Sequence, residues 1–225
     1  TTLALLGPNG AGKTSLIRLL AGRLKPDAGS VRVLGGDPHA DRAVRERIGF
    51  VPQEIALYPR LTVGENLGVF ARLAGLPRSE RRRAVEAVTG RCALDSVRCQ
   101  VVATLSGGNQ RRMNIAASLL AAPDLILLDE PTQGVDLEAR AAIHAVLAGL
   151  RASGAGLVVS THDFSEAERL ADHVAILADG RILREGALAA LIRPFETAPP
   201  EHEAVLEGAP DAAALVAIRE AVPGL

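Results

Sequence analysis

A glycine-rich loop that directly follows a short apolar run constrains the fold of this chain more than any other feature. The run Leu3 to Leu6 has the length of a β-strand, and helical spacing of leucine and isoleucine begins at residue 14. The loop and the residues after it are Gly7, Pro8, Asn9, Gly10, Ala11, Gly12, Lys13, Thr14 and Ser15. A strand that enters such a loop and leaves it as a helix directs backbone N–H groups at one point, where they bind phosphate oxygens. The segment therefore predicts a binding site for a nucleoside triphosphate.

Two side chains at the end of the loop add specific chemistry. The ammonium of Lys13 is expected between the outer phosphates, and the hydroxyl of Thr14 is expected to bind Mg²⁺, because hard cations take oxygen ligands and bring phosphate oxygens with them. An ordinary glycine-rich turn before an amphipathic helix is the alternative. All specified positions agree with the strand-loop-helix context, which argues against that alternative.

The composition is that of a globular protein without an electrostatic preference for nucleic acid. Of the 225 residues 48% are hydrophobic and the net charge is −1, so no basic excess points to a nucleic-acid partner. The longest apolar runs are strand-sized, and any function inside a membrane would belong to a partner. Cys92 and Cys99 fit neither a metal spacing nor a secreted disulfide framework, which indicates reduced thiols. Because a strand begins almost at residue 1 and no initiator methionine precedes it, we expect the chain to be truncated at its N-terminus.

Strands and helices alternate at both ends of the chain around a mainly helical middle. Short apolar or β-branched runs predict strands at 31–34, 48–51, 124–128 and 156–160, and a hairpin of 174–177 with 182–185. Helical spacing predicts helices over 14–24, 62–91, 109–121, 137–150 and 164–171. We therefore expect an α/β core into which a helical subdomain, about residues 62–121, is inserted. After residue 193 the composition turns to Pro, Ala and Glu, which predicts a linker and a partial C-terminal extension at 194–225, helical only at 212–221.

Two adjacent carboxylates follow the apolar run at 124–128. Burying Asp129 and Glu130 without partners would be costly, and a magnesium-nucleotide complex nearby would compensate the cost. We expect Asp129 to support Mg²⁺ and Glu130 to act on the attacking water, at the carboxyl edge of the sheet where open α/β folds bind ligands. The alternative is a polar strand end that points into water.

A second glycine-rich helix start lies far along the chain from the first. Ser106, Gly107 and Gly108 would offer a serine hydroxyl and free N–H groups to an anion. One nucleotide needs only one such loop, so a second suggests that two copies meet, each covering the phosphate held by the other. Alone, this tripeptide is more often a plain helix cap.

Together these motifs resemble those of the ATP-binding cassette family, the ATPase subunits or domains of ABC transporters. The resemblance covers residues 1–193 and implies a P-loop NTPase core with an inserted helical subdomain. Six motifs stand in the family's order: Gly7–Thr14, Gln53, Leu105–Gln110, Leu125–Glu130, Gly134–Asp136 and Thr161–Asp163. They match the first nucleotide motif, the glutamine loop, the signature, the second nucleotide motif, the dimer-contact loop and the histidine switch, respectively.

The resemblance implies further roles around the nucleotide. Gln53 would sense Mg²⁺ and the γ-phosphate, and His162 would contact the γ-phosphate across the site from Glu130. The expected catalytic residues are therefore Glu130, His162, Gln53 and Lys13. The expected metal-binding residues are Thr14, Gln53 and Asp129.

The resemblance also implies that the site is shared between two subunits. Ser106, Gly107 and Gly108 would reach the ATP of the opposite subunit, and Asp136 would link the two sites across the dimer. The sequence departs from the family pattern at Asn109, Gln133 and Val135, where Gln, Ser and Leu are commoner. We expect none of these differences to abolish hydrolysis.

An ATPase that powers transport by a transmembrane permease is the function that the resemblance implies. ATP and Mg²⁺ would be its cofactors, and a second cassette its dimer partner. The permease would hold it at the cytoplasmic face of the cell membrane. The stretch from Gln53 to Leu67 and the tail after residue 194 look like those of bacterial exporters of drugs, antibiotics or polysaccharides. Tyr58, Leu61 and Phe70 could line the permease contact, although core packing explains Leu61 and Phe70 equally well.

Two other functions are less consistent with the sequence. A soluble cassette ATPase that acts on nucleic acid or ribosomes is the main alternative. Cassettes that act on DNA carry long heptad coils between the nucleotide motifs, whereas residues 15–105 hold only a compact insertion here, and a basic excess is missing. A switch GTPase or a simple nucleotide-binding module is a second alternative. No Asn-Lys-x-Asp guanine motif occurs in the sequence, and Glu130 argues for turnover.

Overall fold

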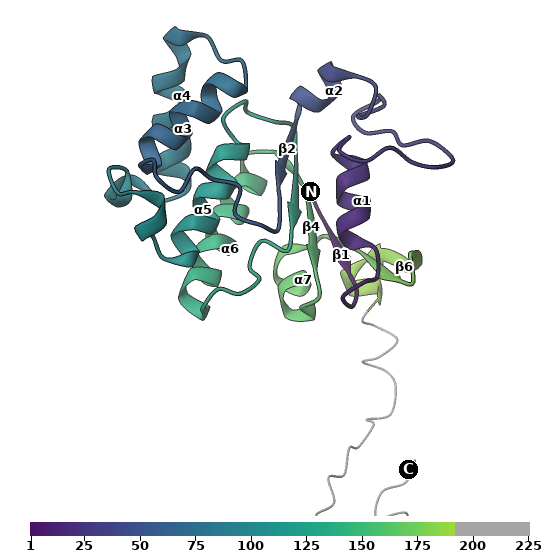
Figure 1. Ribbon diagram of the computed structural model, residues 1–225. Helices are drawn as coiled ribbons and strands as arrows, with labels where there is room; N and C mark the ends of the chain where they lie inside the picture. The colour runs from purple at the N-terminus through teal and green to yellow at the C-terminus, as the bar shows by residue number, and fades with distance from the viewer. Residues whose placement is uncertain (192–225) are drawn as a thin grey trace, which may run out of the picture. The chain divides into compact units, whose positions relative to one another are not determined.

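One six-stranded sheet, in the order β2-β3-β4-β1-β5-β6, organises the computed structural model of the chain, which describes residues 1–191 (Figure 1). Its strands are β1 (Thr2–Leu6), β2 (Ile48–Val51), β3 (Leu125–Asp129), β4 (Gly156–Thr161), β5 (His173–Ala178) and β6 (Arg181–Ala187). All neighbours pair in parallel except β5 and β6, which form the predicted antiparallel hairpin. The linker and the helix at 212–221, which the sequence predicts, lie outside the described residues.

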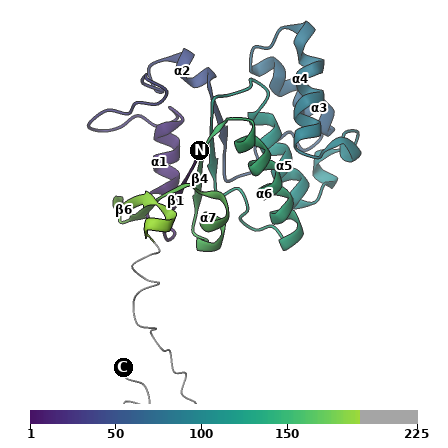
Figure 2. The ribbon, with the colours of Figure 1, turned by 180° about the vertical axis from the view of Figure 1, so that it is seen from behind.

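Helices cover both faces of this sheet. They are α1 (Lys13–Leu20), α2 (Arg42–Glu46), α3 (Val63–Leu73), α4 (Arg78–Arg91), α5 (Gly107–Ser118), α6 (Leu137–Ala152) and α7 (Phe164–Leu170), with short 3₁₀ turns at Asp95–Val97 and Val102–Thr104. Figures 1 and 2 show α1 on one side of the strands and α5 and α6 on the other. No helix within residues 1–191 is both long and apolar enough to span a bilayer.

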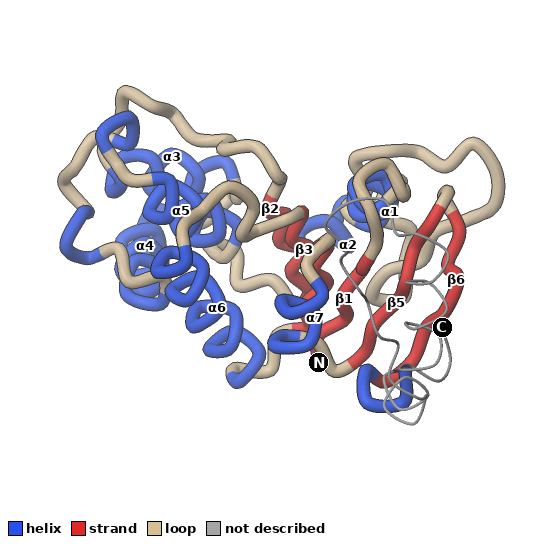
Figure 3. The backbone as a smooth tube through the Cα atoms, turned by 90° about the horizontal axis from the view of Figure 1, so that it is seen from below, coloured by secondary structure: helices blue, strands red, loops and turns tan. Residues whose placement is uncertain are grey.

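The apolar run in β3 is explained by burial on both of its faces. Because side chains alternate along a strand, Leu127 packs into the core that contains Ile17 of α1, while Ile126 and Leu128 pack into the core that contains Ile143 of α6. A strand that is covered on both faces reads as a continuous hydrophobic run rather than as an alternating one. The helices seen on either side of the strands in Figure 3 form these two cores.

The structure corrects the predicted strand at 31–34 and adds a helix that the sequence analysis missed. Val33 forms only an isolated bridge with Gly36, two backbone hydrogen bonds of 2.8 and 3.1 Å within one tight turn. The β-branched residues at 31–34 therefore belong to a turn and do not join the sheet. Helix α2 follows, and its first turn is capped by Asp41, whose carboxylate accepts a hydrogen bond from the N–H of Ala43 (2.8 Å).

The helical stretch expected at 62–91 is two helices. Thr62 and Glu65 form a capping box that starts α3, and the chain then breaks at Gly75, which has a φ of +77°, and at Pro77 before α4. Leu73, the last residue of α3, is 69% exposed. Helix α1 also ends earlier than expected, because Gly22 adopts a φ of +66° and a Cβ there would lie 2.1 Å from the carbonyl oxygen of Pro38.

Candidate functional site

The sheet topology brings four of the predicted motifs to one edge. Strands β2, β3, β4 and β1 are parallel neighbours, so their carboxyl ends lie side by side. Gln53 follows β2, Asp129 ends β3, His162 follows β4, and the glycine loop that starts at Gly7 follows β1. This is the edge of an open α/β sheet where ligands bind.

The glycine loop has a backbone that other residues would not easily adopt. Gly10 and Gly12 have φ values of +82° and +100°, a region that glycine reaches without a steric penalty. A Cβ on Gly7 would lie only 2.3 Å from the carbonyl oxygen of Leu177 in β5. No side chain caps the start of α1, so the N–H groups of its first turn remain free for a ligand.

A cavity of about 350 Å³ lies in front of this loop. Its lining includes Asn9, Gly12, Lys13, Thr14, Gln53 and Glu130. Most of these groups are polar and come from the ends of β1, β2 and β3. The cavity is therefore lined by predicted residues that are more than 100 positions apart in the sequence.

Lys13 lies against the loop and is only 5% exposed. Its Nζ donates hydrogen bonds to the carbonyl oxygens of Gly7 (2.8 Å) and Pro8 (3.1 Å), and it forms an ion pair with Oε1 of Glu130 (3.3 Å). The ammonium is thus held between the loop and the end of β3. A buried charge is tolerated there because it is paired and hydrogen-bonded.

Asp129 and Thr14 are in direct contact. The Thr14 hydroxyl donates a hydrogen bond to Oδ1 of Asp129 (3.1 Å), and the hydroxyl of Ser160 donates a second one to the same oxygen (2.7 Å). Asp129 is almost completely buried. Two of the three residues expected to bind Mg²⁺ therefore lie together beside the cavity.

Glu130 is held in a strained conformation between two basic side chains. Its φ is +46°, a region that few residues other than glycine adopt, and such strain is concentrated at functional sites. Its N–H donates to Oγ of Ser160 (3.0 Å), and its Oε2 lies 3.1 Å from Nδ1 of His162. Because Oε1 pairs with Lys13, this carboxylate lies where it could orient or deprotonate a water molecule at the cavity.

Ser160 is a site residue that the sequence analysis missed. It is completely buried, and its one hydroxyl holds both the Asp129 carboxylate and the Glu130 backbone. The available signal was a single polar residue at the end of the apolar run 156–160. A buried hydroxyl needs hydrogen-bond partners, but no residue near Ser160 in the sequence indicates that its partners are Asp129 and Glu130.

Gln53 is linked to two residues on other segments. Its Nε2 donates a hydrogen bond to Oε1 of Gln133, and the guanidinium of Arg111 donates to the backbone carbonyls of Gln53 and Gln133, the latter at 3.3 Å. Arg111 belongs to α5 and is nearly buried, and this burial lowers the pKa of its guanidinium. The structure thus connects the segment after β2 to α5, a contact that no pattern in the sequence predicts.

The remaining predicted residues do not line the cavity. Ser106 caps α5 by accepting a hydrogen bond from the N–H of Asn109 (3.3 Å), and Asp136 caps α6 by accepting one from Ala139 (2.7 Å). A Cβ on Gly108 would lie 2.4 Å from Cβ of Ala139, so this glycine lets α5 and α6 approach closely. Within one copy these residues cap and pack helices, while Ser106 and Asp136 remain exposed.

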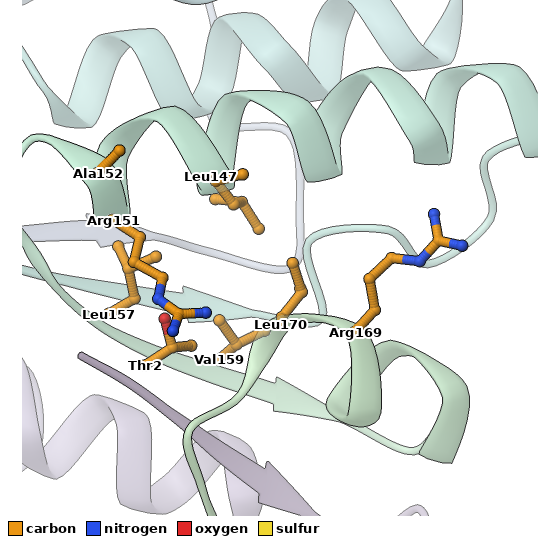
Figure 4. A pocket seen from close by; sticks show the side chains of 9 residues that line it. Thr2, Leu147, Arg151, Ala152, Leu157, Val159, Arg169 and Leu170 are labelled. Carbon is orange, nitrogen blue, oxygen red and sulfur yellow. The ribbon is translucent and has the colours of Figure 1, made fainter.

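A second cavity, of about 290 Å³, lies at the opposite end of the sheet (Figure 4). It is lined by Thr2, Leu147, Arg151, Leu157 and Leu170, among others. Thr2 starts β1, whereas the glycine loop follows its other end, which a strand rise of about 3.3 Å per residue places roughly 13 Å away. This largely apolar cavity is separate from the site described above.

No cluster of three or more His, Cys, Asp or Glu side chains within residues 1–191 is arranged to hold a metal ion. The residues expected to bind the metal still offer oxygen atoms: Thr14 and Gln53 line the cavity, and Asp129 is hydrogen-bonded to Thr14. This donor set suits a hard cation such as Mg²⁺, which keeps waters and uses substrate phosphates to complete its octahedron.

A largely parallel sheet with a glycine loop between β1 and α1, and with a buried acidic pair at the end of β3, defines a P-loop nucleotide-binding protein. A family model described as ABC transporter matches residues 1–133, and the chain belongs to this family. The α/β fold and the family that the motifs led us to expect are thus confirmed.

Bacterial ATP-binding proteins for Nod factor export are among the similar sequences. The chain is 43% identical to Nod factor export ATP-binding protein I of Paraburkholderia xenovorans over 189 residues, which is 84% of the chain and 62% of that protein. It is 43% identical to the protein of the same name from Ralstonia nicotianae over 184 residues, covering 81% of the chain and 57% of that protein. The chain thus spans less than two thirds of the length of these relatives.

Solved structures agree with this assignment. The cbiO1 protein of Clostridium perfringens, part of an ABC transporter complex, aligns with a TM-score of 0.78 at 28% identity, over 87% of this chain and 80% of that one. An ATP-binding cassette solved as a dimer in a post-hydrolysis state with ADP and Pi aligns with a TM-score of 0.74 at 29% identity, over 83% and 85%. An ATP-binding subunit of an ABC transporter aligns with a TM-score of 0.74 at 31% identity, over 87% and 82%.

Proposed function

We propose that this chain binds ATP with Mg²⁺, hydrolyses it in a site completed by a second cassette, and thereby powers export by a transmembrane permease. One observation carries this proposal. Asp129 and Glu130, both nearly buried at the end of β3, contact Thr14 and Lys13 of the glycine loop, and Glu130 also contacts His162. Residues 1–193 would form the ATPase domain, with about 62–121 as its helical subdomain and 194–225 as a linker and extension.

The cavity and its residues suit the triphosphate of a nucleotide. Uncapped N–H groups at the start of α1 can bind phosphate oxygens, and Lys13 can exchange its carbonyl partners for them. Thr14, supported by Asp129, and Gln53 would hold the metal. Bound Mg²⁺ would neutralise charge on the phosphates as the terminal bond breaks.

Glu130 and His162 are assigned to the hydrolytic step. The Glu130 carboxylate is acceptor-only when ionised, so it can accept a proton from a water molecule directed at the γ-phosphate. His162 lies 3.1 Å from that carboxylate and has a side chain that is 49% exposed. It can therefore orient Glu130 and still reach a ligand in the open part of the site.

A second cassette would supply Ser106, Gly107, Gly108 and Asp136 to the nucleotide. These residues stand at the starts of α5 and α6, outside the cavity of their own copy. A helix N-terminus attracts phosphate, so the exposed start of α5 could bind a phosphate held by another copy. The dimeric cassette among the solved structures supports this arrangement.

The dimer proposal predicts an effect of charge and bulk at Ser106. In the Glu130→Gln background, where ATP is expected to be retained, ATP should convert the chain from monomer to dimer in sedimentation-velocity experiments. Adding Ser106→Arg should weaken this association by at least about tenfold, because a large side chain would enter the interface. Ser79→Arg, at an exposed serine in the first turn of α4, is the matched control. Monomers only at saturating ATP would contradict the dimer.

A groove beside Gln53 is the proposed contact for the permease. It has a volume of about 350 Å³ and lies between β2 and the helices α3 and α5, with Phe50, Ala56, Phe70 and Leu73 in its lining. Pro52, also in the lining, precedes Gln53 directly, so an occupant of the groove would lie beside the segment that enters the cavity. The similar proteins named for Nod factor export support the export direction. Docking there would place the chain at the cytoplasmic face of the membrane.

The permease contact can be tested at Leu73, which is exposed on the groove. The chain should co-purify with a multi-span membrane protein encoded beside it, and Leu73→Asp should reduce the recovered complex at least about tenfold by placing a charge in an apolar contact. Leu183→Asp, at an exposed leucine of β6, should leave recovery unchanged. Unchanged recovery of folded Leu73→Asp protein would exclude the groove as the contact.

A further inference from the structure

One buried carboxylate of the described chain has no contact with the cavity. Glu166 of α7 is 3% exposed, and its Oε1 accepts a hydrogen bond from Oγ1 of Thr132 (2.6 Å) and lies 3.0 Å from Nε2 of His144. Burial alone would raise the pKa of this carboxyl, but hydrogen bonds from His144, Thr132 and Thr161 outweigh burial and hold the pKa below its usual value. Because a carboxylate only accepts hydrogen bonds, the hydrogen between His144 and Glu166 is assigned to Nε2 of His144.

Glu166 and its partners Thr132 and His144 lie on three different segments that lead to the site. Thr132 stands two residues after Glu130, in the bend that follows β3. Glu166 itself stands four residues after His162. His144 belongs to α6, whose first residue follows the exposed helix cap at Asp136. A single carboxylate thus ties the Glu130 segment, the His162 segment and α6 together.

Asp163, the residue after His162, connects His162 to the first turn of α7. The N–H of Asp163 donates a hydrogen bond to Oγ1 of Thr161 (3.0 Å), and its carboxylate accepts hydrogen bonds from the N–H groups of Ser165 (2.9 Å) and Glu166 (3.3 Å). Its other oxygen pairs with Arg140 of α6 (2.7 Å). This tight cap leaves little freedom between His162 and the first turn of the helix.

Glu130 depends on such support because its backbone is strained. A residue with a φ of +46° keeps this conformation only where contacts with the surrounding structure hold its backbone in place. The Ser160 hydroxyl fixes its N–H, and Thr132 anchors the chain immediately afterwards. We propose that Glu166 is a positioning residue of the hydrolytic site, which holds the Glu130 segment against the His162 segment through Thr132. This proposal rests on the proposed function and extends it to a residue outside the cavity.

The first test uses Glu166→Gln in the full chain without nucleotide. Hydrogen exchange should become at least about tenfold faster in residues 129–135 and 160–165, because the ties between these segments weaken, and should stay unchanged in residues 2–20 of β1 and α1. Glu168→Gln, at an exposed glutamate on the same helix, should behave like the wild-type chain. Unchanged exchange in both segments would overturn the proposal, and so would faster exchange throughout the chain, which would indicate general destabilisation.

The second test separates positioning from binding. With Glu166→Gln, kcat for ATP hydrolysis should fall at least about tenfold while KM stays within about twofold, because the misplaced group acts in the transition state only. Thr132→Val, which removes the hydroxyl at nearly constant size, should give the same loss, and Thr132→Ser should restore turnover. A kcat of Thr132→Val equal to that of the wild type would overturn the proposal.

The two tests distinguish this inference from the proposed function. A wild-type chain that neither binds nor hydrolyses ATP would refute the proposed function, whereas hydrogen exchange of the nucleotide-free chain would still report on the Glu166 contacts. A wild-type chain that hydrolyses ATP, together with Glu166→Gln protein that is equally active, would refute the positioning role alone.

Discussion

Replacing Lys13 by alanine is expected to abolish ATP binding. The Lys13 ammonium is the one cationic group that lines the cavity among the described residues, and charge-assisted hydrogen bonds to phosphate are among the strongest that a site can make. Losing two of them, at about 1.5–3 kcal/mol each, should raise the Kd for ATP at least about 100-fold. Isothermal titration calorimetry with ATP and Mg²⁺ measures this change.

Lys25 provides a matched control, because it is the only other lysine of the sequence and is exposed. Lys25→Ala should bind ATP like the wild-type chain. Removing Lys13 also leaves the Glu130 carboxylate without its ion pair, so urea unfolding of Lys13→Ala should accompany the titration. A folded Lys13→Ala protein with an unchanged Kd would contradict the assignment of the cavity to phosphate.

The strands that carry the site could be predicted because they are buried on both faces. The residues from Leu125 to Leu128 are all apolar, and the strand predicted at 124–128 became β3, shifted by one residue. The strand prediction failed where a local turn takes the backbone hydrogen bonds that pairing in the sheet would need. The residues at 31–34 have the β-branched composition of a strand, yet Val33 bonds to Gly36 within its own turn, and composition cannot reveal which partner a backbone group will find.

The residues beside the cavity could be predicted because each motif ends a strand or starts a helix, and parallel pairing then brings strand ends together. The contacts that support these residues could not be predicted from the sequence. Ser160 and Glu130 are 30 residues apart, and Thr132 and Glu166 are 34 apart. Locally, Ser160, Thr132 and Glu166 are ordinary polar residues. Only the folded chain shows that their hydrogen bonds hold the segment that carries Asp129 and Glu130.

Glu130→Gln should separate ATP binding from ATP hydrolysis. Lys13, Thr14 and the loop remain, so the Kd for ATP should stay close to that of the wild type, and the isosteric amide keeps the contact with His162 possible. The amide cannot accept a proton from water, and losing general base catalysis should lower kcat by about 10² to 10⁴. Phosphate release at saturating ATP measures the loss, with Glu168→Gln as an exposed control. Turnover close to that of the wild type would remove Glu130 from the catalytic role.

The combination of Glu130→Gln with Glu166→Gln tests whether the two residues act as one unit. If Glu166 contributes only by holding the Glu130 segment, then replacing Glu166 should not lower turnover further in a chain that already lacks the Glu130 carboxylate. The double variant should therefore hydrolyse ATP no more slowly than Glu130→Gln alone, although Glu166→Gln by itself loses at least about tenfold. An independent catalytic or stability effect of Glu166 would instead multiply the two losses. The coupling between these rates thus relates the buried carboxylate of α7 to the chemistry at the end of β3.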